Sequence, residues 1–505
     1  MTILKKLKYN IILLILPGII FLWGCTPEPD VEPDPVITSI PDDTDTQIRD
    51  FVWNAMNSWY LYQAEQDNLD DAMDDNIHDY VQFLQSFDSP EALFDALIYQ
   101  PNIKDRFSFI VDDYELLQNE LQGISEDFGF DYQLVRLSNN SNELIGYVRY
   151  VLPDTPAEEA GLKRGDLFGK VDGNQLTLSN YQRLLFNSRS YDLGLVEFNG
   201  SGFVDEKSVS LTAEVIHENP VFKTEVIENP GGVKVGYLVL NGFNHLYHSE
   251  LNAAFGKLKN AGVDELVLDL RYNPGGAVIT AAMLASMIYT TDTDKNFIVF
   301  GHNAKHRGQN QYLNFFSEVY IFDENYEITG VEPLNSLELD RLFVLTSRST
   351  ASASEAIING LNPYMDVVVI GEQTVGKNVG SRTLYDAPAS DFTSKAQANP
   401  KHKYALQPLT TKIVNSVGFG EFESGFTPDI KVSELDYLLE LKPLGNENEI
   451  LLETALNYLA PTRSQMIQPP GFPEIIVEPG PERRSKNPSY RSLVLDLVDD
   501  ISAGK

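Results

Sequence analysis

The chain has 505 residues, of which 43% are hydrophobic and 22% charged, so wholesale disorder is excluded and about two to four domains are expected. Its formal net charge of -35 gives a surface that repels phosphate backbones, and we expect no sequence-independent nucleic-acid binding. A single cysteine excludes an intrachain disulfide framework and any metal site built from several cysteines.

The N-terminus is typical of an export signal. Three lysines precede an apolar run from Ile11 to Trp23, which is shorter than the roughly 20 residues of a membrane-spanning helix. The run ends in Leu-Trp-Gly-Cys25, which resembles the lipobox of bacterial lipoproteins, in which the cysteine is lipidated and becomes the first mature residue. We therefore expect a signal peptide over 1–24 and lipidation at Cys25. An unmodified cysteine beside a simple cleavage site is the alternative.

Cleavage would make the mature chain still more acidic. Residues 1–24 contain three lysines and no acid, so the net charge would change from -35 to -38. A chain of this charge needs acyl chains to stay on an anionic membrane. We expect a lipoprotein of the bacterial cell envelope, periplasmic or surface-exposed, with the outer membrane as the favoured site. Residues 25–47, rich in Pro and Asp, would form a solvated linker.

Helical patterns come first in the mature chain. Apolar residues recur at three- and four-residue spacing from Ile48 to Trp59, and a second helical stretch covers Tyr80–Leu97. They predict a helical N-terminal domain over 48–115. Residues 116–215 predict a β-rich domain with one helix at 179–187, and its strands are Ile145–Leu152, Leu167–Val171 and Val209–Val215.

Strands alternate with helices over 216–460. The predicted strands are Lys234–Leu240, Glu265–Leu270, Arg341–Thr346 and Asp366–Ile370, and the helices are Glu250–Asn260 and Ser354–Leu361. This alternation predicts a largely parallel sheet with helices on its faces. The tail, 461–505, begins with a Pro-rich stretch that we expect to pack loosely.

A serine-rich turn follows the strand that ends at Thr346. In Ser-Ala-Ser-Glu, residues 352–355, small residues allow a tight turn before a helix. Ser352 would project as a nucleophile, and the Ala353 N–H would be one oxyanion donor at the helix N-terminus. The alternative is that the serines of this turn only cap the helix.

Lys377 lies in a glycine-lined turn after a buried strand. Desolvation disfavours an ammonium group, so a neutral amine there could take the proton of a serine. A surface lysine on a turn is the alternative. Another buried strand ends in Asn273-Pro274-Gly275-Gly276, where consecutive glycines expose backbone N–H groups and suit a second oxyanion donor. A plain strand-to-helix turn is the alternative there.

Together the three motifs resemble the S41 family of serine proteases, the C-terminal processing peptidases. The family has a DLRxNxGG turn, an S-A-S-E turn and a G-K lysine 25 residues after the serine, and here 377 minus 352 is 25. The resemblance implies an α/β protease core (ClpP/crotonase-like), Ser352 as nucleophile, Lys377 as base, an oxyanion hole at Ala353, Gly275 and Gly276, and no cofactor or metal. Phe-Thr-Pro-Asp-Ile, 426–430, matches a further family signature.

Residues 123–215 resemble the PDZ domain that this family carries. The segments 154–157 and 160–166 resemble its turn between strand and helix, and Phe128-Gly129-Phe130 resembles its carboxylate-binding loop. In that loop backbone amides hold the C-terminus of a peptide that adds as a β-strand. The resemblance implies protein or peptide substrates bound by their C-termini, with a PDZ domain that selects substrates and gates the site.

Two positions depart from the family pattern. Many members place a glutamine four residues after the lysine to orient it, where this chain has Ser381, so we assign the third catalytic role to Ser381. An Asp that some relatives place eleven residues after the serine is Pro363 here. These departures leave a non-catalytic, peptide-binding lipoprotein on a protease scaffold as the alternative function.

Other chemistries find less support in the sequence. Gly371–Asn378 nearly spells a phosphate-binding P-loop, but Asn378 stands where Ser or Thr must bind Mg²⁺. The pairs His245/His248 and His302/His306 have helical spacing, but neither lies in an HExxH motif, and we interpret them as surface histidines. No GxSxG motif occurs.

Overall fold

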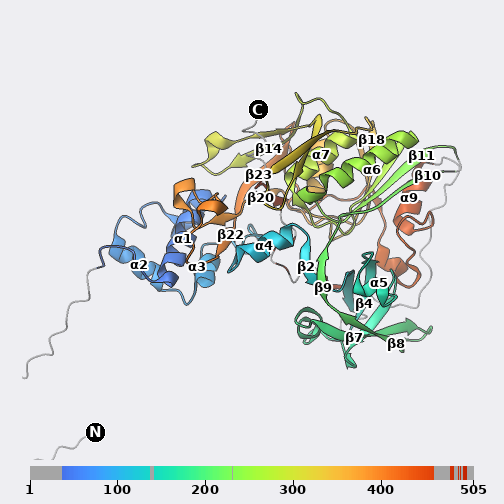
Figure 1. The fold of residues 1–505 in the computed structure, drawn as a ribbon, viewed down its shortest axis with the longest axis horizontal. Coiled ribbons are helices and arrows are strands. Elements are labelled where there is room, and N and C mark those ends of the chain that lie inside the picture. The colour runs from blue at the N-terminus through green and yellow to red at the C-terminus, as the bar shows by residue number, and fades with distance from the viewer. Residues whose placement is uncertain are drawn as a thin grey trace, which may run out of the picture.

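The computed structural model describes residues 37–136, 141–229, 231–459, 478–482, 487, 489–490 and 493–496. The predicted signal peptide and Cys25 lie outside the described residues. No helix within the described ranges is long and apolar enough to span a bilayer. Figure 1 shows a helical part at one end, an α/β core at the other, and a β-rich domain beside that core.

Three helices build the N-terminal part: α1 (Thr44–Trp59), α2 (Ile77–Gln85) and α3 (Pro90–Ala96). Helix α1 begins before the predicted Ile48 because Asp43 caps it, accepting a hydrogen bond from the Thr46 N–H at 2.8 Å. The stretch Tyr80–Leu97 is divided between α2 and α3 because Ser89 caps a new helix with Pro90 in its first turn. The helices pack on a small sheet of β1 (Phe109–Val111), β22 (Ala405–Gln407) and β21 (Leu384–Tyr385).

The β-rich domain is entered and left through an antiparallel pair, β2 (Ile124–Asp127) and β9 (Glu214–His217), and α4 (Tyr114–Leu121) precedes it. Its sheet has the order β25-β3-β4-β5-β7-β8, with β6 paired to β5. The strands are β3 (Phe130–Arg136), β4 (Leu144–Val151), β5 (Leu167–Val171), β6 (Asn174–Gln175), β7 (Ser190–Phe198), β8 (Phe203–Thr212) and β25 (Glu478–Glu482), with the short helix α5 (Pro156–Glu159). Where a helix was predicted at 179–187, one π-helical turn covers Gln182–Phe186.

The core contains a six-stranded sheet in the order β10-β11-β12-β18-β19-β24. All neighbours are parallel except β10, which pairs antiparallel with β11. The strands are β10 (Val221–Glu228), β11 (Lys234–Leu240), β12 (Glu265–Asp269), β18 (Arg341–Thr346), β19 (Asp366–Gly371) and β24 (Ile430–Lys431). The sequence-based expectation of a largely parallel sheet is confirmed.

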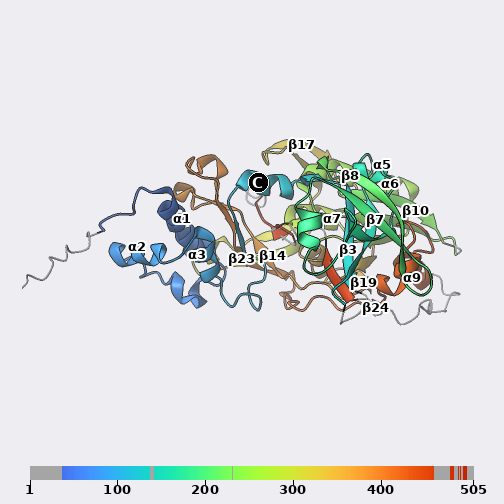
Figure 2. The ribbon, with the colours of Figure 1, turned by 90° about the horizontal axis from the view of Figure 1, so that it is seen from below.

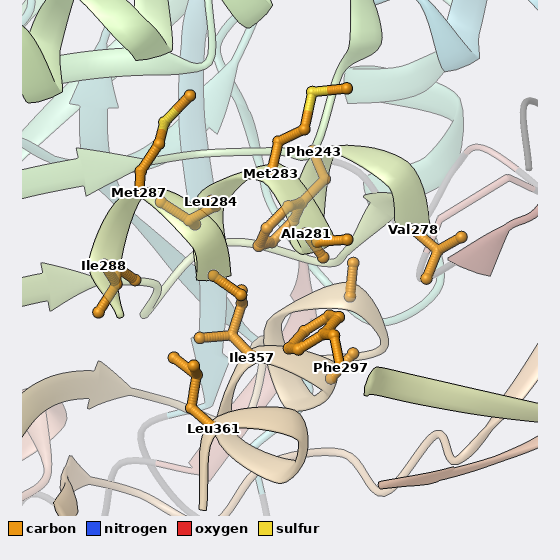
Figure 3. Packing of buried hydrophobic residues seen from close by; sticks show 14 of the residues in the cluster. Phe243, Val278, Ala281, Met283, Leu284, Met287, Ile288, Phe297, Ile357 and Leu361 are labelled. Carbon is orange, nitrogen blue, oxygen red and sulfur yellow. The ribbon is translucent and has the colours of Figure 1, made fainter. Parts of the chain in front are cut away.

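Both faces of this sheet are covered. Alternate strand residues such as Leu266 and Leu268 pack with α6 (His248–Ala261), α7 (Val278–Ile288) and α8 (Ala353–Leu361). Those between them, such as Val267, pack with α9 (Ile450–Leu459) on the other face. Helix α7 is buried along its whole length, and Figure 3 shows its Met283 and Ile288 above Ile357 and Leu361 of α8.

A second six-stranded sheet has the order β13-β26-β20-β23-β14-β15. Its strands are β13 (Gly276–Ala277), β26 (Leu493–Val494), β20 (Val379–Ser381), β23 (Leu409–Asn415), β14 (Asn296–His302) and β15 (Tyr312–Asn314), and β16 (Glu318–Phe322) forms a separate pair with β17 (Ile328–Pro333). Figure 2 shows β14 and β23 between the helical part and the core. The described part of the Pro-rich stretch, 478–482, forms β25 at the edge of the PDZ-domain sheet, and its loose packing stays a prediction. Beyond that stretch the tail supplies β26, and Leu493 and Leu495 are buried.

Candidate active site

Ser352 lies at the N-cap of α8, between the end of β18 and the first helical residue. Its backbone has φ 62° and ψ -115°, a conformation that costs a residue with a side chain on the order of 1–3 kcal/mol. The side chain is 1% exposed, and its Oγ has no hydrogen-bond partner among the described residues. Ser352 also takes part in a capping box with Glu355, whose Oε2 accepts from its N–H, so it caps α8 as the alternative predicts. Capping alone does not explain the strained backbone.

The glycine turn lies directly against this serine. Gly275 and Gly276 have φ of 111° and 132°, and a Cβ on Gly275 would lie 2.6 Å from the Cβ of Ser352. Asn273, fully buried, fixes the turn: its Oδ1 accepts from the Gly275 N–H at 2.9 Å and its Nδ2 donates to Leu240 O at 2.8 Å. Glycine is therefore required here for the backbone to approach Ser352.

The two glycines differ as candidate oxyanion donors. The Gly275 N–H is engaged by Asn273, and the Ala277 N–H donates to Phe243 O at 2.8 Å. Gly276 belongs to β13 and pairs with Leu493 of β26. Ala353 is the first helical residue, where an N–H has no intrahelical acceptor. Of the predicted donors, Ala353 therefore fits the role best in these contacts, while the N–H of Gly275 is engaged and Gly276 is paired with β26.

Glu355 joins the backbone of Ser352 to that of Lys377. Its Oε2 accepts hydrogen bonds from both N–H groups at 2.8 Å, and its Oε1 accepts from the Gly376 N–H at 2.7 Å and the Thr374 hydroxyl at 2.5 Å. Burial raises the pKa of this carboxyl, while the four donors act in the opposite direction. Sequence reasoning did not assign Glu355 a role, although it is the last residue of the S-A-S-E turn.

Lys377 is buried, with a side chain from the β19–β20 connection that reaches the N-terminal part. Its Nζ lies 4.8 Å from the centroid of the Phe107 ring. The neighbouring Arg106 Nη2 donates to Gly376 O at 2.6 Å. The predicted apolar, glycine-lined setting of the lysine is thus present, with a wall supplied by a different part of the chain.

Comparisons with known sequences agree with this geometry. Residues 234–432 match the profile of peptidase family S41, residues 47–109 match the peptidase S41 N-terminal domain, and residues 147–189 match a PDZ domain. This chain belongs to peptidase family S41. The family prediction and the predicted fold, an α/β protease core with an N-terminal domain and a PDZ domain, are confirmed, and the chain is a serine-type peptidase of the C-terminal processing group.

Several relatives of this S41 peptidase can be named. The chain is 26% identical to a carboxyl-terminal-processing protease of Picosynechococcus sp., over 66% of this chain and 71% of that protein. It is 22% identical to a CtpA-like serine protease of Staphylococcus haemolyticus, over 74% and 75% of the two chains. The crystal structure of an S41 protease from Bacteroides fragilis NCTC 9343 aligns with a TM-score of 0.64 at 27% identity, covering 84% of this chain and 98% of that one.

Ser381, predicted as the third catalytic residue, lies at the end of β20 in the S41 core. Its Oγ donates to Leu493 O at 3.2 Å, and its carbonyl oxygen accepts from the Leu495 N–H at the same distance. The hydroxyl and the carbonyl group of Ser381 are therefore both hydrogen-bonded to the C-terminal tail. Its action on Lys377 stays a prediction.

The nucleotide-site alternative fails on local structure. After Lys377 the chain forms β20, a buried strand of the second sheet, whereas a P-loop lysine must open a helix. Gly376 belongs to a tight contact instead of a phosphate cradle, since a Cβ there would lie 2.2 Å from Glu423 O.

The predicted carboxylate-binding loop of the PDZ domain lies just before β3. The N–H groups of Phe128 and Gly129 donate to Asp127 Oδ1 at 2.8 and 3.1 Å. Gly129 has φ 87°, and a Cβ there would lie 2.2 Å from the Thr155 side chain. Gly129 thus has the positive φ that a carboxylate-binding loop requires. The amides of the loop are bound to the Asp127 carboxylate of the same chain.

A buried ionic cluster lies at the end of β12, just before the glycine turn. Arg271 donates to both oxygens of Glu449, at 2.5 and 2.8 Å, and to Glu434 at 3.0 Å. Arg164 of the PDZ domain reaches the same Glu434 at 2.5 Å. These arginines lower the pKa of the Glu434 carboxyl to about 2, against the opposing effect of burial. The cluster ties the PDZ domain to the strand end that carries the turn.

A cavity of about 150 Å³ adjoins the glycine turn. Gly275 and Gly276 line one side, and Glu120, Asp127 and Glu218 line another. Asn487, Ser489 and Tyr490 of the tail complete it, and Ser489 Oγ donates to Glu120 Oε2 at 2.9 Å. The tail therefore lies beside the candidate reaction centre.

The interpretation of the histidines as surface residues is wrong for three of them. His245, His248 and His306 are 3%, 1% and 6% exposed. His248 is held by Thr280 Oγ1 at 2.7 Å and Tyr320 O at 2.8 Å, and burial lowers its pKa to about 4. No group of three or more metal-ligating side chains gathers within the described ranges.

Proposed function

We propose that this S41 peptidase cleaves unfolded or C-terminally tagged proteins, with Ser352 as nucleophile and Lys377 as general base. The observation that carries the proposal is the Glu355 bridge, which holds the backbones of both residues beside the glycine turn. The burial of both Ser352 and Lys377 supports it, because the two side chains lie in a setting from which water is largely excluded.

The reaction proceeds through an acyl-enzyme. Ser352 Oγ attacks the substrate carbonyl carbon while its proton passes to Lys377 Nζ, and the N–H of Ala353 and the turn at Gly275 and Gly276 stabilise the oxyanion. The C–N bond then breaks, and Lys377 returns the proton to the leaving amine. Water, deprotonated by Lys377, hydrolyses the ester and regenerates the Ser352 hydroxyl.

Peptidase activity of residues 26–505 on an unfolded protein tests the dyad. Ser352→Ala and Lys377→Ala should each lose at least about 10³-fold in kcat while keeping the wild-type circular dichroism. Lys412→Ala, whose parent side chain is 47% exposed, is the matched control and should cleave like wild type. Equal cleavage by wild type and Ser352→Ala would refute the mechanism.

A non-catalytic peptide-binding protein is the second candidate. The observation that favours it is the Ser381 hydroxyl, which donates to the tail backbone. An inert wild-type chain that still binds an unfolded protein at every pH from about 6 to 10 would favour this candidate.

For localisation we propose a lipid anchor at Cys25 in the bacterial envelope, at the outer membrane. The Lys-rich, apolar N-terminus and the Leu-Trp-Gly-Cys25 sequence support it. Metabolic labelling with a clickable palmitate analogue should mark the full chain and leave Cys25→Ser unmarked. Labelling of both chains would contradict the assignment.

A further inference from the structure

The edge of the PDZ-domain sheet carries a segment from the far end of the chain. Strand β25 pairs antiparallel with β3, with Glu478 opposite Arg136, Pro479 opposite Val135 and Glu482 opposite Gln133. The segment therefore runs toward the start of β3, where the predicted carboxylate-binding loop lies. A peptide that adds to a sheet edge with this polarity is the ligand of such a domain. The chain's own residues occupy the place of the ligand strand.

The loop end of the same site is occupied as well. Asp127, 4% exposed, places its Oδ1 on the Phe128 and Gly129 amides. These are the amides that would hold the terminal carboxylate of a ligand. Both halves of the peptide site, the strand edge and the amide loop, are therefore filled by groups of the same molecule.

The strand β25 is weakly held compared with β26. Residues 479 and 481 are prolines without an N–H, so only Glu478, Gly480 and Glu482 can donate to β3, and the register shifts between 479 and 482. In contrast, β26 lies between β13 and β20, and its neighbour Leu495 and its own Leu493 are 2% and 0% exposed. We therefore expect β25 to separate from β3 more easily than β26 separates from β13 and β20.

The covalent link to β26 allows β25 to occupy the edge of β3 although its own pairing is weak. Residues 483–492 join the weak strand to the anchored one. A segment tethered over so few residues competes at an effective concentration on the order of millimolar. It can fill a peptide site at low intrinsic affinity, and a free peptide must outcompete it.

We propose that residues 478–482 are a tethered pseudo-ligand of the PDZ domain, which an extended substrate polypeptide displaces from β3 while β26 stays in place. This regulation rests on the proposed peptidase function for its kinetic consequence. The segment competes with substrate, so it raises KM and leaves kcat unchanged.

A reversible crosslink tests the proposal. In the chain from Thr26, which lacks the natural cysteine, Arg136→Cys/Glu478→Cys places two thiols on directly opposed residues. Such pairs lie about 4.5–5.5 Å apart between Cα atoms, within the range of a disulfide. Oxidation should lower kcat/KM on an unfolded protein at least about tenfold, and reduction should restore it. Equal rates in both states would overturn the proposal.

A matched control and a second variant accompany the crosslink. Glu197→Cys/Val204→Cys joins β7 to β8 in the same domain, and its activity should not depend on oxidation. Glu478→Pro/Glu482→Pro removes two of the three N–H donors of β25 and should lower KM at least about threefold at unchanged kcat. An unchanged KM would show that β25 does not compete with substrate.

A binding measurement separates this inference from the peptidase proposal. Fluorescein-labelled, carboxymethylated casein is titrated into the Ser352→Ala form of the crosslinkable chain, and anisotropy is read in both redox states. Binding only after reduction supports the pseudo-ligand even if no chain cleaves, in which case only the peptidase proposal fails. Equal binding in both states overturns the pseudo-ligand regardless of turnover.

Discussion

At the scale of single residues, Glu355 links the two positions that we propose as the catalytic dyad. Ser352 and Lys377 are 25 residues apart in sequence, and one carboxylate oxygen accepts from the N–H of each. Such charge-assisted bonds are about twice as strong as neutral ones, and a buried acceptor lost from them leaves its donors unsatisfied. We therefore expect Glu355 to position both partners of the proposed dyad.

Glu355→Gln should lower kcat about 10- to 100-fold, because an amide NH₂ replaces one of the two accepting oxygens. It should also shift the alkaline limb of the pH–rate profile, since Lys377 loses its fixed backbone. Glu265→Gln, at a half-buried ion pair with Arg341, is the control and should leave the profile in place. An unshifted profile in Glu355→Gln would reduce Glu355 to a structural residue.

Gly275→Ala should abolish measurable turnover while the chain stays folded. The added Cβ would meet the Ser352 Cβ at 2.6 Å, and the φ of 111° disfavours any side chain. Gly202→Ala has open space around its Cβ and serves as the control. Activity of Gly275→Ala within about threefold of wild type would contradict the close approach that we assign to this turn.

At the scale of elements, regular segments could be predicted and contacts between distant segments could not. The strands Leu167–Val171, Lys234–Leu240 and Arg341–Thr346 were predicted with their observed bounds, because apolar residues dominate each of these short segments. The serine turn, the lysine turn and the glycine turn could be recognised because each of these motifs is a short run of neighbouring residues. Nothing local in residues 478–482, with prolines at 479 and 481, indicates a strand, since its partner β3 is more than 300 residues away.

The contact between the PDZ domain and the core belongs to the same scale. Arg164→Met should lower the free energy of unfolding by about 2–4 kcal/mol, because it removes one partner of a buried ion pair with Glu434. Urea denaturation measures this. Arg189→Met removes a pair whose arginine is 83% exposed and should cost less than about 1 kcal/mol. Equal stability of both variants would show that the buried cluster does not hold the domain.

At the scale of the whole molecule, we expect acid to lower the stability of the fold in two pH ranges. Burial lowers the pKa of His248 to about 4 and that of His245 to about 3, so the unfolded chain binds more protons than the folded one below about pH 6.5, and stability falls as the pH drops toward these values. The depressed pKa of Glu434, about 2, adds a second loss below about pH 4.5. Thermal unfolding measured from pH 8 to pH 3 should show a falling Tm. In His248→Gln, the fall in Tm below about pH 6.5 should be smaller than in wild type.

The side chains around Lys377 bear on the shortest fragment of the chain that could be an active peptidase. Phe107 and Arg106 belong to the N-terminal part, yet they cover the lysine and hold the carbonyl of Gly376. The reaction centre is thus shared between two ends of an elongated molecule (Figure 1). A fragment that begins after residue 115 would carry every residue of the dyad, its oxyanion donors and Glu355, and would still expose Lys377 to water. On the proposed mechanism, cleavage therefore requires the N-terminal part and the core to be folded together.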